Sequence, residues 1–235
     1  MRSKSSFADP LGNAVWEYHN GERNKQLWIN TSYGEPEEMP IEVYFRDFDG
    51  MPELEQIALD LCDVSVLDVG ACTGAHSLFL QGQGHEVTAV DNSKGCIKTL
   101  HERGVKIVIE SDFFELPPSN YGTILMMMNG LGLAGKLDGL GPLLKHCESL
   151  LRSGGFILAD SSDISYLLEG GSKPEDRYFG EVSFQFDYAG QLGKWFDWLY
   201  VDFQTLSEEV SKFGWSSELI CASDDDAYLM RMWTD

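Results

Sequence analysis

The sequence predicts an α/β fold, a doubly wound and mostly parallel sheet of seven strands with helices on both faces. Three observations lead to this prediction. Between residues 53 and 163, short apolar runs alternate with segments of helical periodicity. These runs are not interrupted by polar residues at every second position, which is typical of strands buried on both faces. Two further apolar runs at the C-terminus, separated by a turn, complete the predicted sheet.

The elements of this core follow in order along the chain. The first is a helix at 52–62, because apolar residues recur there at the helical period and a proline opens it. The expected strands are the apolar runs at 65–70, 86–91, 105–112, 123–130 and 156–163. The expected helices between them lie at 74–84, 93–104 and 138–155. We expect Gly104 to cap the second of these helices and glycines to end the third.

The segments outside this alternation predict additions to the core. Residues 1–52 are rich in aromatic residues and turn formers, so we expect a packed N-terminal cap, and residues 53–235 form the core domain. Residues 180–203 alternate in both halves around a turn, which predicts an inserted β-hairpin. Its aromatic face either walls a pocket, packs on the cap or forms a dimer contact.

The C-terminal part predicts one more helix and two strands. A helix at 205–214 begins with Thr205 or Ser207 as its N-cap and Glu208 or Glu209 in its first turn. The runs "SSELICAS" and "AYLMRMW" then predict an antiparallel pair of strands.

Composition excludes several classes of function. The chain of 235 residues has 17 basic and 38 acidic residues, a formal net charge of −21 and no basic cluster. Binding to nucleic acid or to an anionic membrane is therefore not expected. The sequence contains no run of about 18 apolar residues, the length that a membrane-spanning helix needs, so no membrane span is expected. The five cysteines are odd in number and widely spaced, which indicates neither a disulfide framework nor a metal site, so we expect a cytoplasmic protein.

Acidic residues end three successive predicted strands, at Asp68, Asp91 and Asp112. The carboxyl ends of parallel strands meet at one edge of a sheet, where ligands of open α/β sheets bind. Gly70 and Gly74 follow the first acid, and glycines at such a turn let a ligand approach the backbone. Because a buried carboxylate needs donors, we expect a ligand with several donor groups here.

Two nucleotide cofactors fit such a turn. A dinucleotide fingerprint requires G-x-G-x-x-G, but Cys72 takes the place of its second glycine, and this pattern gives Asp68 no role. S-adenosylmethionine offers an amino group, a ribose diol, an adenine N6 donor and a sulfonium, which match a row of acids. Asp91 would bind a ribose in either case.

The ordered motifs over about residues 53–163 resemble those of class I S-adenosylmethionine-dependent methyltransferases of the small-molecule type. The motifs are "VLDVGACTG", "VTAVDNS", "IESDFFEL", "TILMMMNG" and "LLRSGGFILADSSD". The resemblance implies a Rossmann-like methyltransferase fold and S-adenosylmethionine as the cofactor. Cys72 departs from the family's first motif, acid-x-Gly-x-Gly-x-Gly, at its middle glycine.

The resemblance also implies a set of cofactor-binding residues. Asp68 and the loop after it hold the methionyl amino end, and this loop contains Gly70, Ala71, Cys72 and Gly74. Asp91 accepts from both ribose hydroxyls, and Asn92 lies beside the adenine.

The later motifs supply the rest of this implied set. Asp112 accepts from the adenine N6 and Phe113 packs near the ring. Met128, Asn129 and Gly130 flank the cofactor where the fourth strand opens toward the methyl group.

Several residues are candidates at the carboxylate and methyl ends of this ligand. Arg46 in the cap suits the methionyl carboxylate, because a guanidinium pairs with it through two hydrogen bonds. The alternative for Arg46 is a surface pair with Glu42 or Asp47. Tyr33 would reach the sulfonium or the acceptor, or else pack on the core.

The catalytic candidates are Asn129, Asp160 and Tyr33. Asp160 and Asp163 at the fifth strand end would orient an amine or act as a base, and otherwise cap a loop or helix. His76 is a further candidate base.

The favoured function is methyl transfer to a small cationic or neutral molecule. The alternatives are an NAD(P)-dependent oxidoreductase on a similar fold and a cofactor-binding module without catalysis. An aminopropyl transferase shares the first motifs, but the sequence has no dedicated diamine-binding acid cluster beyond "ADSSD". A homodimer is compatible with each of these functions.

Overall fold

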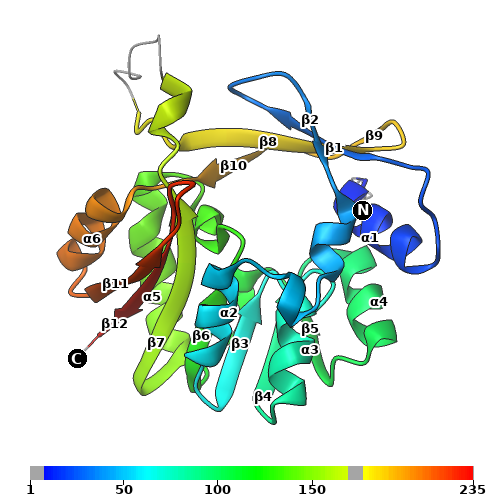
Figure 1. Ribbon diagram of the computed structural model, residues 1–235. Coiled ribbons are helices and arrows are strands. Elements are labelled where there is room, and N and C mark those ends of the chain that lie inside the picture. The colour runs from blue at the N-terminus through cyan, green and yellow to red at the C-terminus, as the bar shows by residue number, and fades with distance from the viewer. Residues whose placement is uncertain (1–7, 169–176, 235) are drawn as a thin grey trace, which may run out of the picture.

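The computed structural model describes residues 8–168 and 177–234, which form a seven-stranded core sheet and a smaller sheet above it (Figure 1). The core strands are β3 (Ser65–Val69), β4 (Glu86–Asp91), β5 (Ile107–Glu110), β6 (Tyr121–Met126), β7 (Leu151–Ser162), β11 (Ser216–Ala222) and β12 (Ala227–Trp233). Their order is β11-β12-β7-β6-β3-β4-β5. The first five are mutually parallel, and β12 pairs antiparallel with both β7 and β11. The predicted doubly wound α/β sheet is therefore confirmed.

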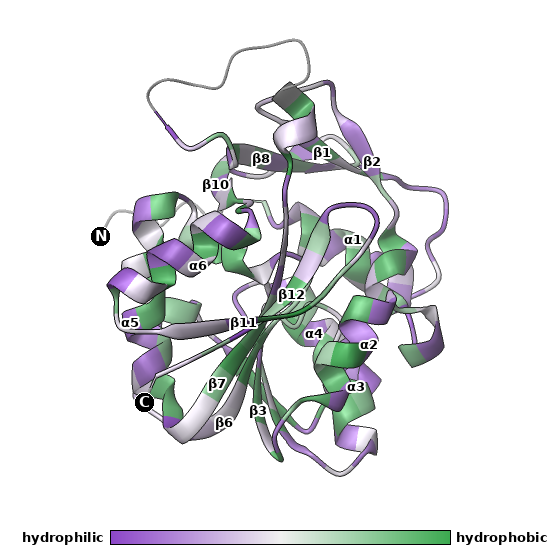
Figure 2. Ribbon diagram, turned by 60° about the vertical axis from the view of Figure 1, so that its left-hand side comes forward, coloured by the Kyte–Doolittle hydropathy of each residue, from purple (hydrophilic) through white to green (hydrophobic). Residues whose placement is uncertain are grey.

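Helices cover both faces of the core sheet. They are α2 (Glu53–Asp60), α3 (Ala75–Gly82), α4 (Lys94–Arg103), α5 (Leu140–Leu150) and α6 (Phe203–Lys212). Apolar residues of α2 and α3 pack on one face, and those of α5 and α6 pack on the other. Figure 2 shows the resulting concentration of hydrophobic residues along β3, β6 and β7. No helix within the described ranges is long and apolar enough to cross a membrane.

The helix expected at 93–104 is present as α4, and its predicted C-terminal cap, Gly104, is confirmed. The Ser93 side chain accepts a hydrogen bond from the Cys96 backbone N–H, which caps the start of α4. Gly104 ends the helix with a φ of 89°, a left-handed conformation that glycine adopts without a steric cost. Ser93 marks the start of α4 and Gly104 marks its end. The start of the helix closely follows Asp91, the acid that ends β4.

The predicted helix at 138–155 is too long at its C-terminal end. Helix α5 stops at Leu150, and β7 begins at the next residue and includes both glycines. The physical reason is close strand pairing, because a Cβ on Gly155 would lie 2.9 Å from the carbonyl oxygen of Tyr121. Gly155 therefore allows β7 to approach β6, and neither glycine stops a helix.

The predicted N-cap of the last helix is also wrong. Helix α6 begins at Phe203, and Asp202 caps it by accepting a hydrogen bond from the Thr205 backbone N–H at 2.9 Å. Neither Thr205 nor Ser207 serves as the cap, because the helix starts two residues earlier than its sequence pattern indicates.

The smaller sheet, here called the cap sheet, joins the two segments predicted as additions to the core. Its strands are β1 (Leu27–Thr31), β2 (Glu37–Met39), β8 (Glu181–Tyr188), β9 (Gln191–Leu192) and β10 (Phe196–Leu199). The order is β10-β8-β1-β2, with β9 paired to β8. The predicted hairpin is present, and its first strand pairs antiparallel with β1, so it packs on the cap as one alternative foresaw.

The cap sheet lies across the carboxyl edge of the core sheet and is supported at both ends (Figure 1). At one end, Leu27 and Tyr188 pack with helix α1 (Pro10–His19). At the other, the indole of Trp198 lies against Gly132, where a Cβ would overlap with it. Short 3₁₀ helices complete the connections, namely η1 (Ile41–Phe45), η2 (Phe48–Gly50), η3 (Phe113–Glu115), η4 (Gly130–Ala134), η5 (Leu137–Gly139) and η6 (Ser165–Leu168).

Helix α1 docks on the first turn of α4 through a carboxylate and two glycines. Asp9 caps α1 and accepts hydrogen bonds from the Ser93 hydroxyl at 2.9 Å and the Gly95 backbone N–H at 3.1 Å. A Cβ on Gly95 would overlap with the backbone of Gly12, so the helices meet at backbone distance. Residues 1–7 of the predicted cap lie outside the described residues.

We predict that Gly95→Ala destabilises the protein by about 1–3 kcal/mol, because the added methyl group forces α1 away from α4. The midpoint of thermal unfolding measures this loss. The control is Gly82→Ala, since a Cβ on Gly82 meets no atom within 4 Å and alanine favours a helix. Equal midpoints for the two variants would contradict this description of the contact.

Candidate functional site

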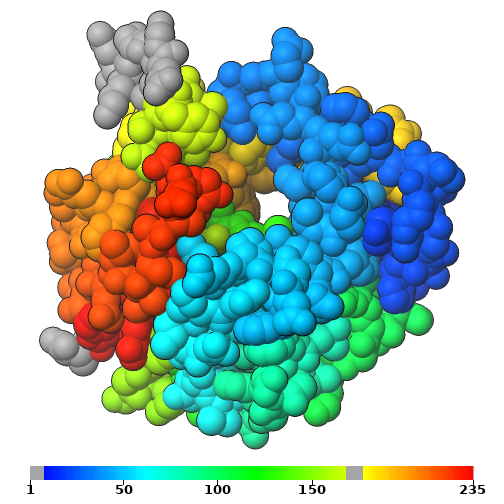
Figure 3. Space-filling view, viewed as in Figure 1, coloured from blue at the N-terminus to red at the C-terminus, as the bar shows by residue number. Residues whose placement is uncertain are grey.

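An opening passes through the molecule between the carboxyl edge of the core sheet and the cap sheet (Figure 3). In this view, residues of the first third of the chain (blue to cyan) border one side of it. Residues of the β8 to α6 region (yellow to orange) border the other. The acids predicted at the strand ends lie along the core side, so the candidate site is described from this edge upward.

Asp91 holds together the two loops that flank the end of β4. Its Oδ2 accepts a hydrogen bond from the Cys72 backbone N–H at 2.9 Å, and its Oδ1 accepts one from the Ser93 backbone N–H at 2.8 Å. Burial raises the pKa of Asp91, and these two N–H donors lower it. Asp91 thus positions both the glycine loop after β3 and the start of α4.

The glycine loop between β3 and α3 turns through left-handed backbone conformations. Gly70, Cys72 and Gly74 have φ values of 69°, 51° and 80°. A Cβ on Gly74 would lie 2.8 Å from the side chains of Leu100 and Val105, so this glycine serves packing. A Cβ on Gly70 would meet no atom within 4 Å, so the backbone there faces open space that a ligand can approach.

Asp68 is buried beneath this loop at the start of α3. The Ser77 hydroxyl donates a hydrogen bond to its Oδ2 at 2.6 Å. Burial raises the pKa of Asp68, while the charge of His76 and the Ser77 donor lower it. The carboxylate therefore lies at the positive end of a helix, which stabilises a negative charge.

Arg46 reaches the same edge from the cap and pairs with a buried acid of α2. Its Nη2 lies 2.7 Å from Oε1 of Glu55, and Nε2 of His76 lies 2.8 Å from Oε2 of the same acid. Arg46 thus pairs with neither Glu42 nor Asp47. The Nε of Arg46 is buried and has no hydrogen-bond partner, so one donor of this guanidinium remains to be satisfied.

Glu55 also sets the charge of His76. Burial lowers the pKa of His76, but its hydrogen bond to Glu55 and the charges of Asp68 and Glu55 together raise the pKa above its usual value. A protonated His76 donates to Glu55, which leaves it without a free nitrogen lone pair to act as a base.

Asn129 links the turn after β6 to the neighbouring strand β7 and to the last residue of β10. Met128 and Asn129 both have left-handed φ values, 58° and 59°. The Asn129 side chain donates to the carbonyl oxygen of Leu199 at 3.1 Å and accepts from the Ser161 hydroxyl at 2.8 Å. These bonds hold the buried Asn129 in a conformation that only a few residue types adopt readily.

Asp160 lies at the end of β7, half-buried beside the opening. Its Oδ1 accepts a hydrogen bond from the Asn129 backbone N–H at 2.8 Å. Burial raises the pKa of Asp160 to about 7, and the nearby charge of Glu55 adds to this effect. Asp163, the second acid of this strand end, instead accepts from the Ser165 backbone N–H at the start of η6.

The remaining predicted cofactor residues lie toward β4 and β5. Asn92 is exposed, as is Asp112, whose Oδ1 accepts from the Phe114 backbone N–H at 2.9 Å. Phe113 is buried in the core, with its ring centroid 4.9 Å from that of His146 in an edge-to-face contact. Asp112 is therefore free to accept further bonds, while Phe113 is mainly a packing residue.

Tyr33 lies on the cap, and its ring makes an edge-to-face contact with that of Phe184, with the ring centroids 6.2 Å apart. Its side chain is 41% exposed. Burial of the rest raises its pKa to about 12, so the phenol stays protonated as a donor at neutral pH.

The sequence did not indicate three further residues of this edge. Glu55 lies on the buried stripe of α2, three residues before Ala58, and this position was the one available signal. Ser161 bridges Asn129 and the backbone N–H of Val201, a contact that only the tertiary fold creates. Tyr200 follows β10, and the charge of Asp160 raises the pKa of its phenol. No local pattern in the sequence indicates this proximity.

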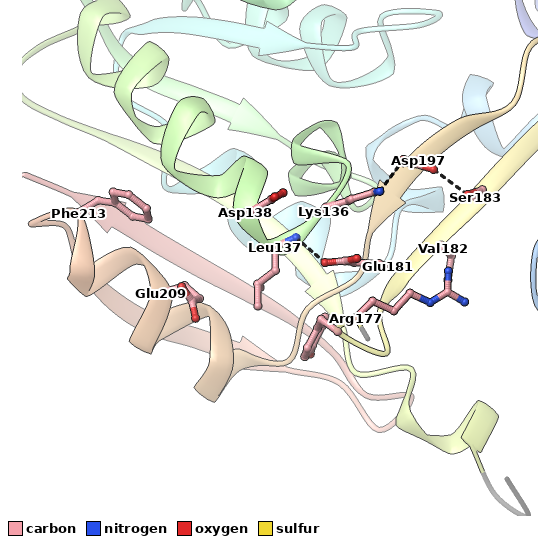
Figure 4. Close-up of a pocket in the computed structure, with 11 residues that line it drawn as sticks. Lys136, Leu137, Asp138, Arg177, Glu181, Val182, Ser183, Asp197, Glu209 and Phe213 are labelled. Carbon is pink, nitrogen blue, oxygen red and sulfur yellow. Dashed lines mark hydrogen bonds and ion pairs between the residues drawn. The ribbon is translucent and has the colours of Figure 1, made fainter. Parts of the chain in front are cut away.

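A separate surface pocket lies away from the strand ends, between η5, β8 and α6 (Figure 4). Its volume is about 680 Å³. Basic and acidic side chains line this pocket, including Lys136, Arg177 and Glu181. None of the predicted cofactor residues borders this pocket. Within the described part of the chain, no group of three or more histidine, cysteine or acidic side chains is arranged to hold a metal ion.

Comparisons with known proteins agree with this description. Residues 66–155 match a family model described as a methyltransferase domain. A search of curated proteins finds no match. The solved structure of an S-adenosylmethionine-dependent methyltransferase from Bacteroides fragilis, in complex with S-adenosyl-L-homocysteine, is similar over 96% of this chain and 94% of that one. It shares 36% sequence identity with a TM-score of 0.89.

More distant structures share the fold. The CcbJ methyltransferase from Streptomyces caelestis is 16% identical, with a TM-score of 0.62 over 82% of this chain and 95% of its own. The sugar N-methyltransferase KedS8 from Streptoalloteichus sp. is 12% identical, with a TM-score of 0.56 over 86% and 96% of the two chains.

We predict that Asp160→Asn stabilises the protein in alkaline solution more than in acid. Because the pKa is about 7 in the folded state, the fold keeps a proton that the unfolded chain loses above about pH 4. The free energy of unfolding therefore falls as the pH rises from about 4 to about 7. Asparagine does not titrate, so the variant should gain about 1–3 kcal/mol above pH 7.

Thermal unfolding of both proteins across the pH range measures this difference. Asp163→Asn is the matched control, because it removes a charge at the same strand end. A gain for Asp160→Asn of the same size at both ends of the range would show that burial does not shift this carboxyl group.

Proposed function

The chain belongs to the S-adenosylmethionine-dependent methyltransferases, and we propose that its acceptor is a small molecule enclosed between the strand ends and the cap sheet. The observation that carries this proposal is the cap sheet itself. It is built from an N-terminal segment and from the hairpin inserted between β7 and α6, and it spans the carboxyl edge of the core sheet. A cap supported at two ends suits an acceptor that fits inside the opening better than a macromolecular one.

The cofactor is S-adenosylmethionine, and the residues present fit it. The buried Nε of Arg46 needs an acceptor, which a methionyl carboxylate supplies. Gly70 faces open space, so a ligand can lie against the loop Gly70–Gly74. We propose that Asp68, Ala71 and Cys72 surround the amino end together with these glycines.

We propose that the nucleoside part binds along the ends of β4 and β5. Asp91 would accept from the ribose hydroxyls in addition to its two backbone donors, since each carboxylate oxygen has two lone pairs. Asn92 and Asp112 are exposed and would bind the adenine edge, and Phe113 would support that edge from the core.

When bound, the cofactor supplies a methyl group activated by a positively charged sulfur. The contribution of this chain is alignment and exclusion of water. Met128 and Asn129 would flank the reacting end, because their left-handed backbone is held rigidly by the bonds of Asn129. Tyr33 from the cap and Asp160 from β7 would contact the acceptor from opposite sides.

Charge supports a cationic or neutral acceptor. The formal net charge of −21 repels polyanions, so nucleic acid is a poor acceptor. The alternative of an NAD(P)-dependent oxidoreductase is not favoured by the comparisons. A module that binds the cofactor without turnover would be distinguished by the absence of methylated product.

We further propose a cytoplasmic setting and a division into a cap (1–52) and a core domain (53–235). All five cysteines are free thiols, including Cys72 and Cys96, whose sulfurs lie 3.7 Å apart. Free thiols in such contact persist in a reducing compartment.

We predict that two substitutions lower affinity for different parts of the cofactor, one for its nucleoside part and one for its amino acid part. Calorimetry is carried out with S-adenosylhomocysteine and with 5′-methylthioadenosine, which lacks the amino acid part. Asp91→Asn should weaken both ligands by about 10- to 100-fold, because each loses a charge-assisted hydrogen bond from the ribose. Arg46→Lys should weaken S-adenosylhomocysteine by about tenfold and leave 5′-methylthioadenosine unchanged, because lysine lacks the planar fork.

The control is Asp60→Asn, since Asp60 is exposed at the C-terminal end of α2. It should alter neither affinity. If Arg46→Lys weakened both ligands equally, or if Asp91→Asn weakened neither, the proposed orientation of the cofactor would be wrong.

A further inference from the structure

The carboxylate of Asp160 forms no ion pair with any described residue, although the charge of His76 lowers its pKa. Its only hydrogen bond from another described residue comes from the Asn129 backbone N–H. No lysine or arginine of the described ranges forms an ion pair with it. The residue is half-buried, and no oxygen of its carboxylate is both buried and without a partner, so the second oxygen is accessible to water or to a ligand.

The titratable groups around Asp160 come from four elements, and none of them supplies a free positive charge. Glu55 of α2 adds a negative charge, and His76 of α3 is already bonded to Glu55. Tyr228 of β12 and Tyr200, which follows β10, are phenols whose pKa values are raised by burial. No hydrogen bond from a described residue reaches the second oxygen of Asp160, so this oxygen can accept one from a bound ligand.

Three aromatic side chains, Tyr33, Phe184 and Tyr200, connect the cap sheet with the surroundings of Asp160. Phe184 makes edge-to-face contacts with both Tyr33 and Tyr200, each with ring centroids 6.2 Å apart. Burial raises the pKa of Tyr200, and the neighbouring charges of Asp160 and Glu37 raise it further. Such rings attract a cation through their faces, and tyrosine hydroxyls accept hydrogen bonds from it.

We propose that the acceptor is a primary or secondary amine that binds as an ammonium ion against Asp160, and that Asp160 removes the proton that masks its nitrogen. This inference rests on the proposed function, because it assigns the substrate class of that same site. A carboxylate acceptor would be repelled by Asp160 and Glu55. An alcohol would leave the negative charge of Asp160 uncompensated.

The atoms and charges of the transfer balance. The Asp160 carboxylate takes one proton from the ammonium ion, which leaves a neutral amine with a lone pair. That lone pair forms the new N–C bond as the C–S bond breaks, and the electron pair of the broken bond stays on sulfur. The positive charge of the sulfonium thus ends on the methylated nitrogen, and Asp160 passes its proton to water after release. A carboxyl pKa near neutrality suits this exchange.

Calorimetry on the protein loaded with S-adenosylhomocysteine tests this inference without turnover. The probes are benzylamine and cyclohexylamine, each compared at neutral pH with the alcohol of the same skeleton, benzyl alcohol and cyclohexanol. The proteins are the wild type, Asp160→Asn and the matched control Asp163→Asn. Asparagine keeps an acceptor oxygen for the Asn129 N–H, so the variant should fold, which its thermal midpoint verifies.

We expect the wild type to bind at least one amine about tenfold or more tightly than its alcohol, the difference of a charge-assisted hydrogen bond. Asp160→Asn should abolish this preference and Asp163→Asn should keep it. Equal binding of amines and alcohols, a preference that survives in Asp160→Asn, or no amine binding at all would overturn the inference. Failure of the wild type to bind S-adenosylhomocysteine would instead contradict the proposed function itself.

Discussion

The structure depends on carboxylates held at one edge of a buried sheet by neutral donors. Asp68 is bonded by a hydroxyl, Asp91 by two backbone N–H groups and Asp160 by one. Among the described carboxylates of this edge, only Glu55 forms ion pairs, one with Arg46 and one with His76. Because backbone and hydroxyl donors do not cancel a charge, this edge keeps a negative potential that favours a ligand with amino, hydroxyl and sulfonium groups. The negative potential of this edge therefore results from the use of neutral donors in place of cationic ones.

The N-terminal segment and Asp91 are joined at one small part of the fold, the first turn of α4. Ser93 donates its backbone N–H to Asp91 and its hydroxyl to Asp9 of the cap. The far side of the cap depends on β8, and Asn30 and Gln185, 155 residues apart in sequence, are bonded across β1 and β8. The cap sheet therefore requires both the N-terminal segment and the hairpin 181–199, and the N-terminal segment rests on the same turn that positions Asp91.

The core strands and the acids that end them could be predicted, because buried parallel strands are continuous apolar runs and their ends are marked by polar residues. Long-range contacts could not. Gly155 lies in a strand because Tyr121 passes close to it, although its sequence resembles a helix stop. Asp202 caps α6 ahead of the pattern that favoured Thr205. Glu55 has the position of an ordinary helical residue, and only the approach of Arg46 gives it a role.

The central claim is that the acidic edge beneath the cap sheet is where the cofactor binds. A crystal structure of the protein with S-adenosylhomocysteine tests it most directly. The account predicts the ribose hydroxyls within hydrogen-bond distance of Asp91, the carboxylate at Arg46 Nε and the sulfur facing the side of Asp160. A ligand found in the surface pocket beside Lys136 and Arg177, or bound at the edge with neither Asp91 nor Arg46 in contact, would contradict it.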